Sequence, residues 1–213
     1  MLDSICDVMK IAYNKSWIST RDGNASFKRK DEDFLYVTAS GVRKQNMNSE
    51  MMIKLKLDDS KLGYSRVLDN IQEKIIGLEP TGELLLHILL QSNLPSNRVV
   101  LHLHPTYIIA AMHANLDLQK LSSDFPEINR YTRVGPTVPE TPPISIALAN
   151  AATHSLNLNS ITGKVDFDII GLKSHGIICI GEDAFSALEH CERLESICMM
   201  VLASGNHLKC KCN

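Results

Sequence analysis

The sequence predicts an α/β protein, a three-layer α/β/α sandwich around a largely antiparallel (mixed) central sheet. Short β-rich runs follow one another closely, as in NASFKRK and then FLYVTAS, and apolar residues at helical spacing recur elsewhere along the chain. The order is not a regular alternation of strand and helix, which would favour a parallel sheet. The length of 213 residues, with 44% hydrophobic and 22% charged residues, fits one globular domain covering 1–213.

The first part of the chain is expected to open with a helix and continue with strands. The helix is predicted by apolar residues at helical spacing, namely Ile5, Val8, Met9 and Ala12. The runs at 24–30 and 34–40 are predicted to be two strands, closed by the polar turn DED at 31–33. In MIKLKL, at 52–57, apolar residues alternate with lysines, which indicates a strand with one wet face.

The middle of the chain is expected to hold two buried elements and a short helix. A Leu-rich helix should follow Pro80, with Thr81 as its N-cap. The apolar run VVLHL at 99–103 indicates a buried strand, and a short helix at 106–114 follows it.

The last third of the chain is expected to add helix, strands and a long final helix. Consecutive prolines at 142–143 introduce a helix that runs to about Ser155. KVDFDIIGLKSHGIICIG, at 164–181, supplies two β-rich runs. A long helix at 184–203 should end at Gly205.

Charge and hydropathy argue against nucleic acid and membranes as partners. The net charge is −2, and no basic cluster alternates with aromatic residues. The N-terminus lacks the charged-then-apolar order of a signal peptide, and no apolar run approaches the ~20 residues of a membrane span. We therefore expect a cytoplasmic protein.

The cysteines fit a reducing compartment. Four of the six, Cys6, Cys179, Cys191 and Cys198, lie in apolar surroundings that suit reduced core thiols. Cys210 and Cys212 form a terminal C-x-C pair, which without partners is a weak sign of a metal or redox role.

Two histidines stand close together on the predicted strand at 99–103. Because side chains alternate along a strand, His102 and His104 should project from the same side. Burying two imidazoles is costly, and a metal ion that both coordinate offsets the cost. His175, in SHG before an apolar run, is the best third ligand, and three His ligands leave Zn²⁺ the open position of a catalytic site. The other histidines are interpreted as core or surface residues: His87, His113, His154, His190 and His207.

A carboxylate and an anion pocket are expected near the predicted metal. Glu83 lies in the first turn of the Leu-rich helix, where the helix dipole favours an acid in any case. Thr81 and Gly82 would expose backbone N–H groups at the same helix end, and such ends bind phosphate. The polar turns STRDGNAS and TASG could complete the pocket. Together these features indicate an enzyme for a phosphorylated substrate.

Five motifs in order, DGNAS, TASG, EPTGE, HLHPT and SHG, resemble those of the class II aldolase/adducin superfamily over nearly the whole chain. The resemblance is greatest to aldolases of the L-rhamnulose-1-phosphate and L-fuculose-1-phosphate type. It implies a class II aldolase-like fold and a homotetramer with active sites near subunit boundaries. It also implies cleavage of a ketose 1-phosphate to dihydroxyacetone phosphate and a short aldehyde.

The resemblance also implies roles for individual residues. One Zn²⁺ per subunit would be held by His102, His104 and His175, and would supply Lewis-acid catalysis. Glu83 would be the acid/base that returns a proton to the substrate carbon. The remaining implied residues are the phosphate contacts Asn24, Ser40, Thr81 and Gly82, and a second carboxylate, Glu127.

Gly82 departs from the family pattern, because such enzymes usually have Ser at this position. The missing hydroxyl puts the identity of the anionic group in question, and Arg21 in STRDGN could substitute for it.

Three other activities remain open. Methylthioribulose-1-phosphate dehydratases keep the histidines and a Glu, and L-ribulose-5-phosphate 4-epimerases share the metal site but carry Asp where Glu83 stands. Adducin-type domains are interaction modules that have lost the metal ligands, and the intact His triad argues against that reading.

Overall fold

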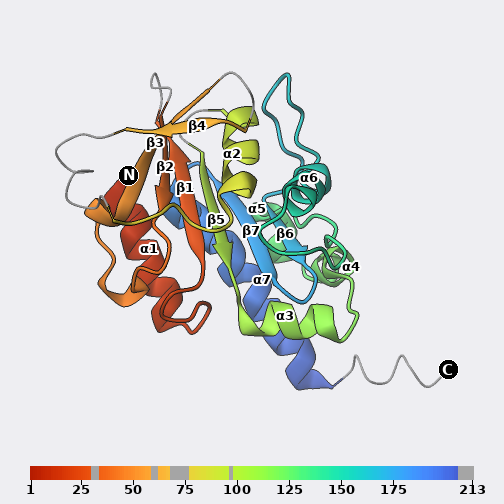
Figure 1. The fold of residues 1–213 in the computed structure, drawn as a ribbon. Coiled ribbons are helices and arrows are strands. Elements are labelled where there is room, and N and C mark those ends of the chain that lie inside the picture. The colour runs from red at the N-terminus through yellow and green to blue at the C-terminus, as the bar shows by residue number, and fades with distance from the viewer. Residues whose placement is uncertain (30–33, 59–61, 68–76, 96–97, 206–213) are drawn as a thin grey trace.

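The centre of the molecule is a seven-stranded sheet (Figure 1). The computed structural model describes residues 1–29, 34–58, 62–67, 77–95 and 98–205. The strand order is β4-β3-β2-β1-β5-β7-β6, and every neighbouring pair is antiparallel. The strands are β1 (Asn24–Lys28), β2 (Phe34–Thr38), β3 (Met52–Leu57), β4 (Tyr64–Arg66), β5 (Val99–Leu103), β6 (Ile169–Leu172) and β7 (Gly176–Gly181). Two isolated parallel bridges at the β6 edge make the sheet mixed, as predicted.

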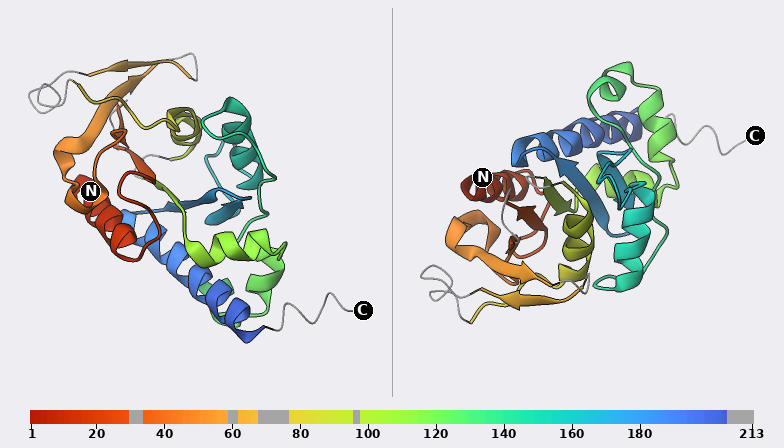
Figure 2. Two further views of the ribbon diagram at one scale, coloured as in Figure 1. Left: turned by 60° about the horizontal axis from the view of Figure 1, so that its bottom comes forward. Right: turned by 90° about the horizontal axis from the view of Figure 1, so that it is seen from above.

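Helices cover both faces of this sheet and form the three predicted layers, which Figure 2 shows edge-on. The residues of β5 alternate between two cores: Leu101 packs with one set of helices and Val100 with the other. The first set is α1 (Leu2–Asn14), α3 (Thr106–His113), α4 (Leu118–Ser123), α5 (Pro126–Tyr131) and α7 (Ala184–Ser204). The second set is α2 (Leu84–Asn93) and α6 (Ile146–Ser155). Two 3₁₀ turns, η1 (Lys44–Asn46) and η2 (Ser49–Met51), precede β3.

Most of the predicted elements are confirmed. The apolar stripe of α1 is fully buried, β1 and β2 form an antiparallel hairpin, and β3 buries Ile53 and Leu55 while Lys56 is exposed. The predicted turn at 31–33 lies outside the described residues. Gly205 ends α7 in the left-handed conformation, with φ 68°. The four cysteines expected in the core are buried and free, whereas the terminal C-x-C pair is not among the described residues.

The start of α2 differs from the prediction. The helix begins at Leu84 with Glu83 at the N-cap, two residues later than an N-cap at Thr81 implies. The reason is backbone pairing: Thr81 N–H donates to Thr38 O at 3.0 Å, and Pro80 forms a bridge with Ala39. This pairing holds the segment extended beside β2, so the chain turns into the helix only afterwards. Glu83 is thereby placed where β2 and α2 meet.

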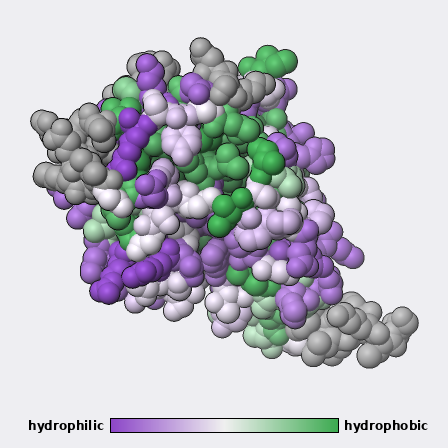
Figure 3. Space-filling view, viewed as in Figure 1, coloured by the Kyte–Doolittle hydropathy of each residue, from purple (hydrophilic) through white to green (hydrophobic). Residues whose placement is uncertain are grey.

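Three short elements were not predicted from the sequence: β4, α4 and α5. Each has three to six residues, too few for a periodic pattern to emerge. In the described part of the chain, no helix is both long and apolar enough to cross a membrane. Figure 3 shows hydrophobic side chains gathered in the upper middle of this face, around α2, and hydrophilic ones at its lower left and lower right.

Candidate metal centre and anion pocket

Three histidines meet at the end of the central strand. His102 is the fourth residue of β5 and is 1% exposed, and His104 follows immediately after the strand. His175 comes from the turn between β6 and β7, where Ser174 has φ 60°. Gly176 permits the approach, since a Cβ there would lie 2.4 Å from Leu103 O and 2.7 Å from His104 Cδ2. The SHG turn therefore fits against β5 only with glycine at this position.

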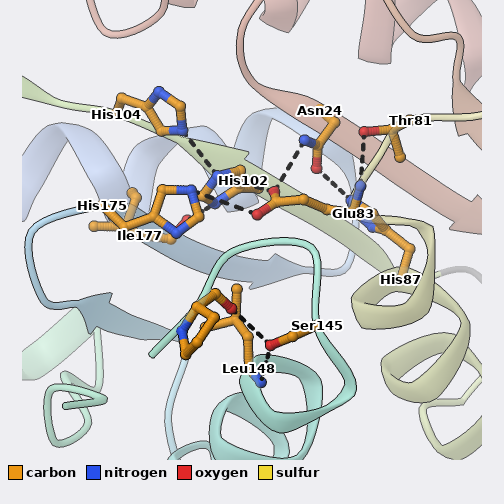
Figure 4. A network of polar contacts seen from close by, with 11 residues as sticks. Asn24, Thr81, Glu83, His87, His102, His104, Ser145, Leu148, His175 and Ile177 are labelled. Atoms are coloured by element: carbon orange, nitrogen blue, oxygen red, sulfur yellow. Dashed lines mark hydrogen bonds and ion pairs between the residues drawn. The ribbon is translucent and has the colours of Figure 1, made fainter. Parts of the chain in front are cut away.

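The three imidazoles present their nitrogens to one point. One ring nitrogen of each lies within 4.8 Å of the others, and the Nε2 atoms of His102 and His104 are 2.8 Å apart (Figure 4). His102 Nδ1–H donates to Ile177 O at 2.9 Å, which leaves its Nε2 as a lone pair aimed at the cluster. Burial, and then repulsion from the neighbouring histidines, hold the pKa of His102 well below its usual value, and the pKa of His104 is lowered by the same causes. His102 and His104 are therefore neutral near pH 7.

This cluster fits a divalent metal ion. Neutral imidazoles with a fixed tautomer are good ligands for such ions, and a backbone carbonyl on the far nitrogen is the usual way to orient them. Glu83 Oε2 lies 3.0 Å from the lone pair of His102 Nε2, a repulsive contact that a cation would relieve. Two buried atoms here have no hydrogen-bond partner, Glu83 Oε1 and His175 Nδ1. The set of ligand atoms and the unpaired buried atoms both indicate that a cation fits at this point.

Glu83 connects the histidines to the rest of the pocket. Its Oε2 accepts from Asn24 Nδ2 at 3.1 Å, and its Oε1 lies 3.4 Å from His175 Nε2. The carboxylate is almost fully buried, so its orientation is set by these neighbours and not by water. Figure 4 shows it between the histidines and the β1 side chain of Asn24.

A pocket of about 260 Å³ extends from this cluster. Nine of the ten residues singled out in the sequence line it: Arg21, Asn24, Ser40, Thr81, Gly82, Glu83, His102, His104 and His175. They come from the β1 turn, the end of β2, the start of α2, β5 and the β6–β7 turn. The sheet register explains the gathering, because β5 pairs with both β1 and β7 and places Asn24 opposite His102.

The tenth residue, Glu127, lies elsewhere. It is on α5 and lines a separate pocket of about 340 Å³ with Tyr131, Arg193 and Met200 of the α5–α7 region. Because α5 packs on α7, within one chain Glu127 is not brought to the histidines. Its role as a second carboxylate stays a prediction that needs a neighbouring subunit.

Lys44 is a pocket residue that the sequence did not reveal. It is 1% exposed, and its ammonium donates to Arg21 O at 3.2 Å and Val42 O at 3.3 Å. Burial lowers its pKa to about 8, an effect that the nearby Asp22 partly opposes. The pocket lining therefore includes a buried lysine besides the residues predicted from the sequence. In sequence, Lys44 lies in a basic, polar stretch, and nothing marks it as buried.

Comparison with known proteins identifies the family of this chain. The model of the family "Class II Aldolase and Adducin N-terminal domain" matches residues 3–202. The L-fuculose phosphate aldolase of Methanococcus maripaludis (strain C5) is 25% identical over 205 residues, 96% of this chain and 97% of the relative. The rhamnulose-1-phosphate aldolase of Bacteroides thetaiotaomicron is 27% identical over 156 residues, 66% of this chain and 55% of the relative.

A solved structure shows the same fold. The sugar-phosphate aldolase from Thermotoga maritima aligns with a TM-score of 0.73 at 18% identity, over 95% of this chain and 93% of that one. The predicted resemblance is confirmed, and both relatives are named as aldolases, which are lyases. The chain therefore belongs to the class II aldolase and adducin N-terminal domain family.

Proposed function

We propose that this protein is a zinc-dependent aldolase that cleaves a ketose 1-phosphate to dihydroxyacetone phosphate and a short aldehyde. The observation that carries the proposal is a buried carboxylate, Glu83, set directly against a three-histidine cluster in a pocket that also holds anion-binding groups. A metal ligand set, an acid/base and an anion site in one pocket are the parts that this reaction needs.

The metal would be held by His102, His104 and His175, each of which brings one ring nitrogen to the same point. Three imidazoles suit Zn²⁺ and leave a position for substrate. When bound, the ion supplies a Lewis acid that stabilises negative charge on the substrate's carbonyl oxygen.

Glu83 is the proton carrier in this proposal. In the condensation direction its carboxylate removes a proton from the carbon beside the carbonyl of dihydroxyacetone phosphate, and the C–H electron pair moves towards the carbonyl oxygen. In cleavage it returns a proton to that carbon. The N–H of Asn24 orients the carboxylate, and burial excludes water that would compete for the proton.

The phosphate is proposed to bind on the far side of the pocket from the histidines. Ser40 and Thr81 offer hydroxyls there, Gly82 offers a backbone N–H group, and Lys44 supplies the charge. Charge-assisted hydrogen bonds are about twice as strong as neutral ones, and an ammonium out of water is poorly screened. Arg21 also lines the pocket and is the second basic candidate.

An assay of retro-aldol cleavage across a panel of ketose 1-phosphates tests this function. Dihydroxyacetone phosphate and an aldehyde should form in equal amounts from at least one member, and a chelator should abolish the reaction. Exchange of one methylene hydrogen of dihydroxyacetone phosphate with D₂O should occur without any aldehyde and should require Glu83. Loss of water without a new aldehyde would support a dehydratase instead, and inversion at one carbon an epimerase.

We also propose an assembly and a location. A cytoplasmic homotetramer with active sites near subunit boundaries fits the family resemblance, and Ile144, which lines the pocket, is an exposed apolar residue. Light scattering that shows a fully active monomer at micromolar concentration would contradict the tetramer.

A further inference from the structure

A buried polar network lies behind Glu83, and the proton transfer described above leaves it unused. It consists of His87 and Gln91 on α2 and Ser26 on β1, all fully buried. Burying three polar side chains in the layer between α2 and the sheet is costly unless they are hydrogen-bonded, and all of their polar atoms except Gln91 Oε1 have a partner. The network ends at Asn24, which touches Glu83.

The far end of the network fixes the direction of its hydrogen bonds. Gln91 Nε2 lies 3.2 Å from Ser26 O and 3.0 Å from Arg98 O, and both carbonyls can only accept. The same nitrogen is 3.1 Å from Ser26 Oγ, and because an amide nitrogen does not accept, the hydroxyl cannot donate its proton to Gln91. Its own proton must go to its other neighbour, His87 Nδ1, at 2.7 Å.

That hydroxyl selects the tautomer of His87. With Nδ1 accepting, the ring proton is on Nε2, which donates to Asn24 Oδ1 at 2.5 Å. Burial lowers the pKa of His87 to about 3, so the ring stays neutral and keeps one donor and one acceptor. Asn24 therefore points its carbonyl at His87 and its Nδ2 at Glu83 Oε2, as Figure 4 shows.

We propose that His87 is a positioning residue that acts through Asn24 to hold the Glu83 carboxylate against the histidine cluster. The proposal rests on the proposed role of Glu83. If the Asn24 amide were reversed, its oxygen would face the carboxylate and repel it; the donor chain Gln91, Ser26, His87, Asn24 excludes that arrangement. Asn24 pairs with His102 in the sheet. The same strand register therefore places both the last residue of the hydrogen-bond network and the proposed metal site.

Kinetics of His87 variants test the role. His87→Leu removes the donor while keeping an apolar side chain in the core, and His87→Gln can keep an N–H near the position of Nε2. We expect His87→Leu to lower kcat by about 10- to 100-fold, the usual scale for residues that orient a metal site or its ligands, with KM and metal content near wild type. His87→Gln should recover most of kcat. Unchanged kcat in His87→Leu, or equal losses in both variants, would overturn the proposal.

His113→Leu is the matched control, because His113 is exposed at the end of α3. It should leave kcat, KM and metal content unchanged.

A measurement on the wild-type protein keeps the test independent of activity and of whether variants fold. Nitrogen-15 NMR of the histidine side chains should show His87 as the neutral tautomer with its proton on Nε2. A proton on Nδ1 would overturn the proposal, because Asn24 would then lose its donor. If the wild type cleaves no ketose phosphate but His87 has the expected tautomer, the proposed function fails while the hydrogen-bond chain stands.

Discussion

The two sides of the pocket are built differently. On the histidine side, Glu83 contacts both His102 and His175. His102 is also hydrogen-bonded to the backbone at Ile177, and Glu83 to Asn24. On the side proposed to bind the anion, Ser40 and Gly82 line the pocket from loops, and Lys44 donates two hydrogen bonds to the carbonyls of Arg21 and Val42. The first side is preorganised for one geometry. The second side combines loop groups with one buried charge.

This difference separates residues whose geometry the reaction requires from residues that can be exchanged to change substrate specificity. The proposed metal site and acid/base need fixed geometry, and the sheet register supplies it by pairing β5 with β1 and β7. An anion site tolerates exchange of one hydroxyl for another donor, since several hydrogen bonds share the task. Gly82, where the resemblance led us to expect Ser, lies on the side proposed to bind the anion.

The largest effect should follow loss of a histidine. His102→Ala, His104→Ala and His175→Ala should each remove most of the metal, measured by elemental analysis. Activity should fall at least about a thousandfold, because a metal contributes several kcal/mol to the transition state. His113→Ala, at an exposed position, serves as the control. Metal that persists in all three variants but disappears on removal of Cys210 and Cys212 would place the site elsewhere.

A smaller loss is expected when the acid/base is changed without the ligands. Glu83→Gln keeps the shape of the side chain and should keep most of the metal, while kcat falls roughly 10²–10⁴-fold. Metal analysis and kinetics on the same sample separate the two roles. Near-normal turnover in Glu83→Gln would contradict the assignment of Glu83.

The histidine side could be predicted from the sequence because its signals are local. His102 and His104 share one strand, and SHG and EPTGE are short motifs whose residues the sheet then brings together. Of the fold, α1, α7 and the β1–β2 hairpin were equally visible, because their apolar spacing extends over several residues.

The site residues that could not be predicted from the sequence are those whose role depends on burial, which tertiary packing creates. Lys44 and His87 belong to types that are common on surfaces or in ordinary cores, and no pattern shows that one lines a pocket and the other contacts Asn24. Glu127 is the opposite case. The resemblance placed it in the active site, whereas within one chain its short helix, α5, places it in a separate pocket.

The anion side can be tested through its charge. Lys44→Met should raise KM for a phosphorylated ketose by about 10- to 100-fold, since hydrogen bonds to charged groups contribute ~1.5–3 kcal/mol. Effects on kcat should be smaller. Lys120→Met, at an exposed lysine of α4, is the control. Equal KM in Lys44→Met and wild type would show that Lys44 does not bind the phosphate. Its role would then be structural, through its hydrogen bonds to Arg21 O and Val42 O.

The pH dependence of the same pair of proteins sharpens this test. The pKa of Lys44 is lowered to about 8 from 10.5, so between these values the unfolded chain binds more protons than the folded one. The contribution of Lys44 to the free energy of unfolding therefore rises with pH across this window. Phosphate binding should weaken over the same range as the charge is lost. Denaturation of wild type and Lys44→Met at several pH values gives the difference in their free energies of unfolding, which isolates the contribution of Lys44. A difference that does not change with pH would contradict the lowered pKa of Lys44.

The smallest effect is expected at Gly82, where the structure adds a condition to the sequence argument. A Cβ at Gly82 would lie 3.1 Å from Cδ1 of Ile144, a residue that is 62% exposed and has φ 55°, a strained value for a β-branched side chain. Ile144 must therefore shift slightly before a serine hydroxyl can reach the anion.

We expect Gly82→Ser to lower KM for a phosphorylated ketose by no more than roughly 10-fold, the value of one added hydrogen bond. Gly82→Ser combined with Ile144→Ala should gain more than the sum of the single changes, because the alanine removes the obstruction. Steady-state kinetics of the four proteins in this cycle give the coupling. Loss of all activity in Gly82→Ser, or equally good cleavage of unphosphorylated ketoses by wild type, would show that this side of the pocket does not bind phosphate.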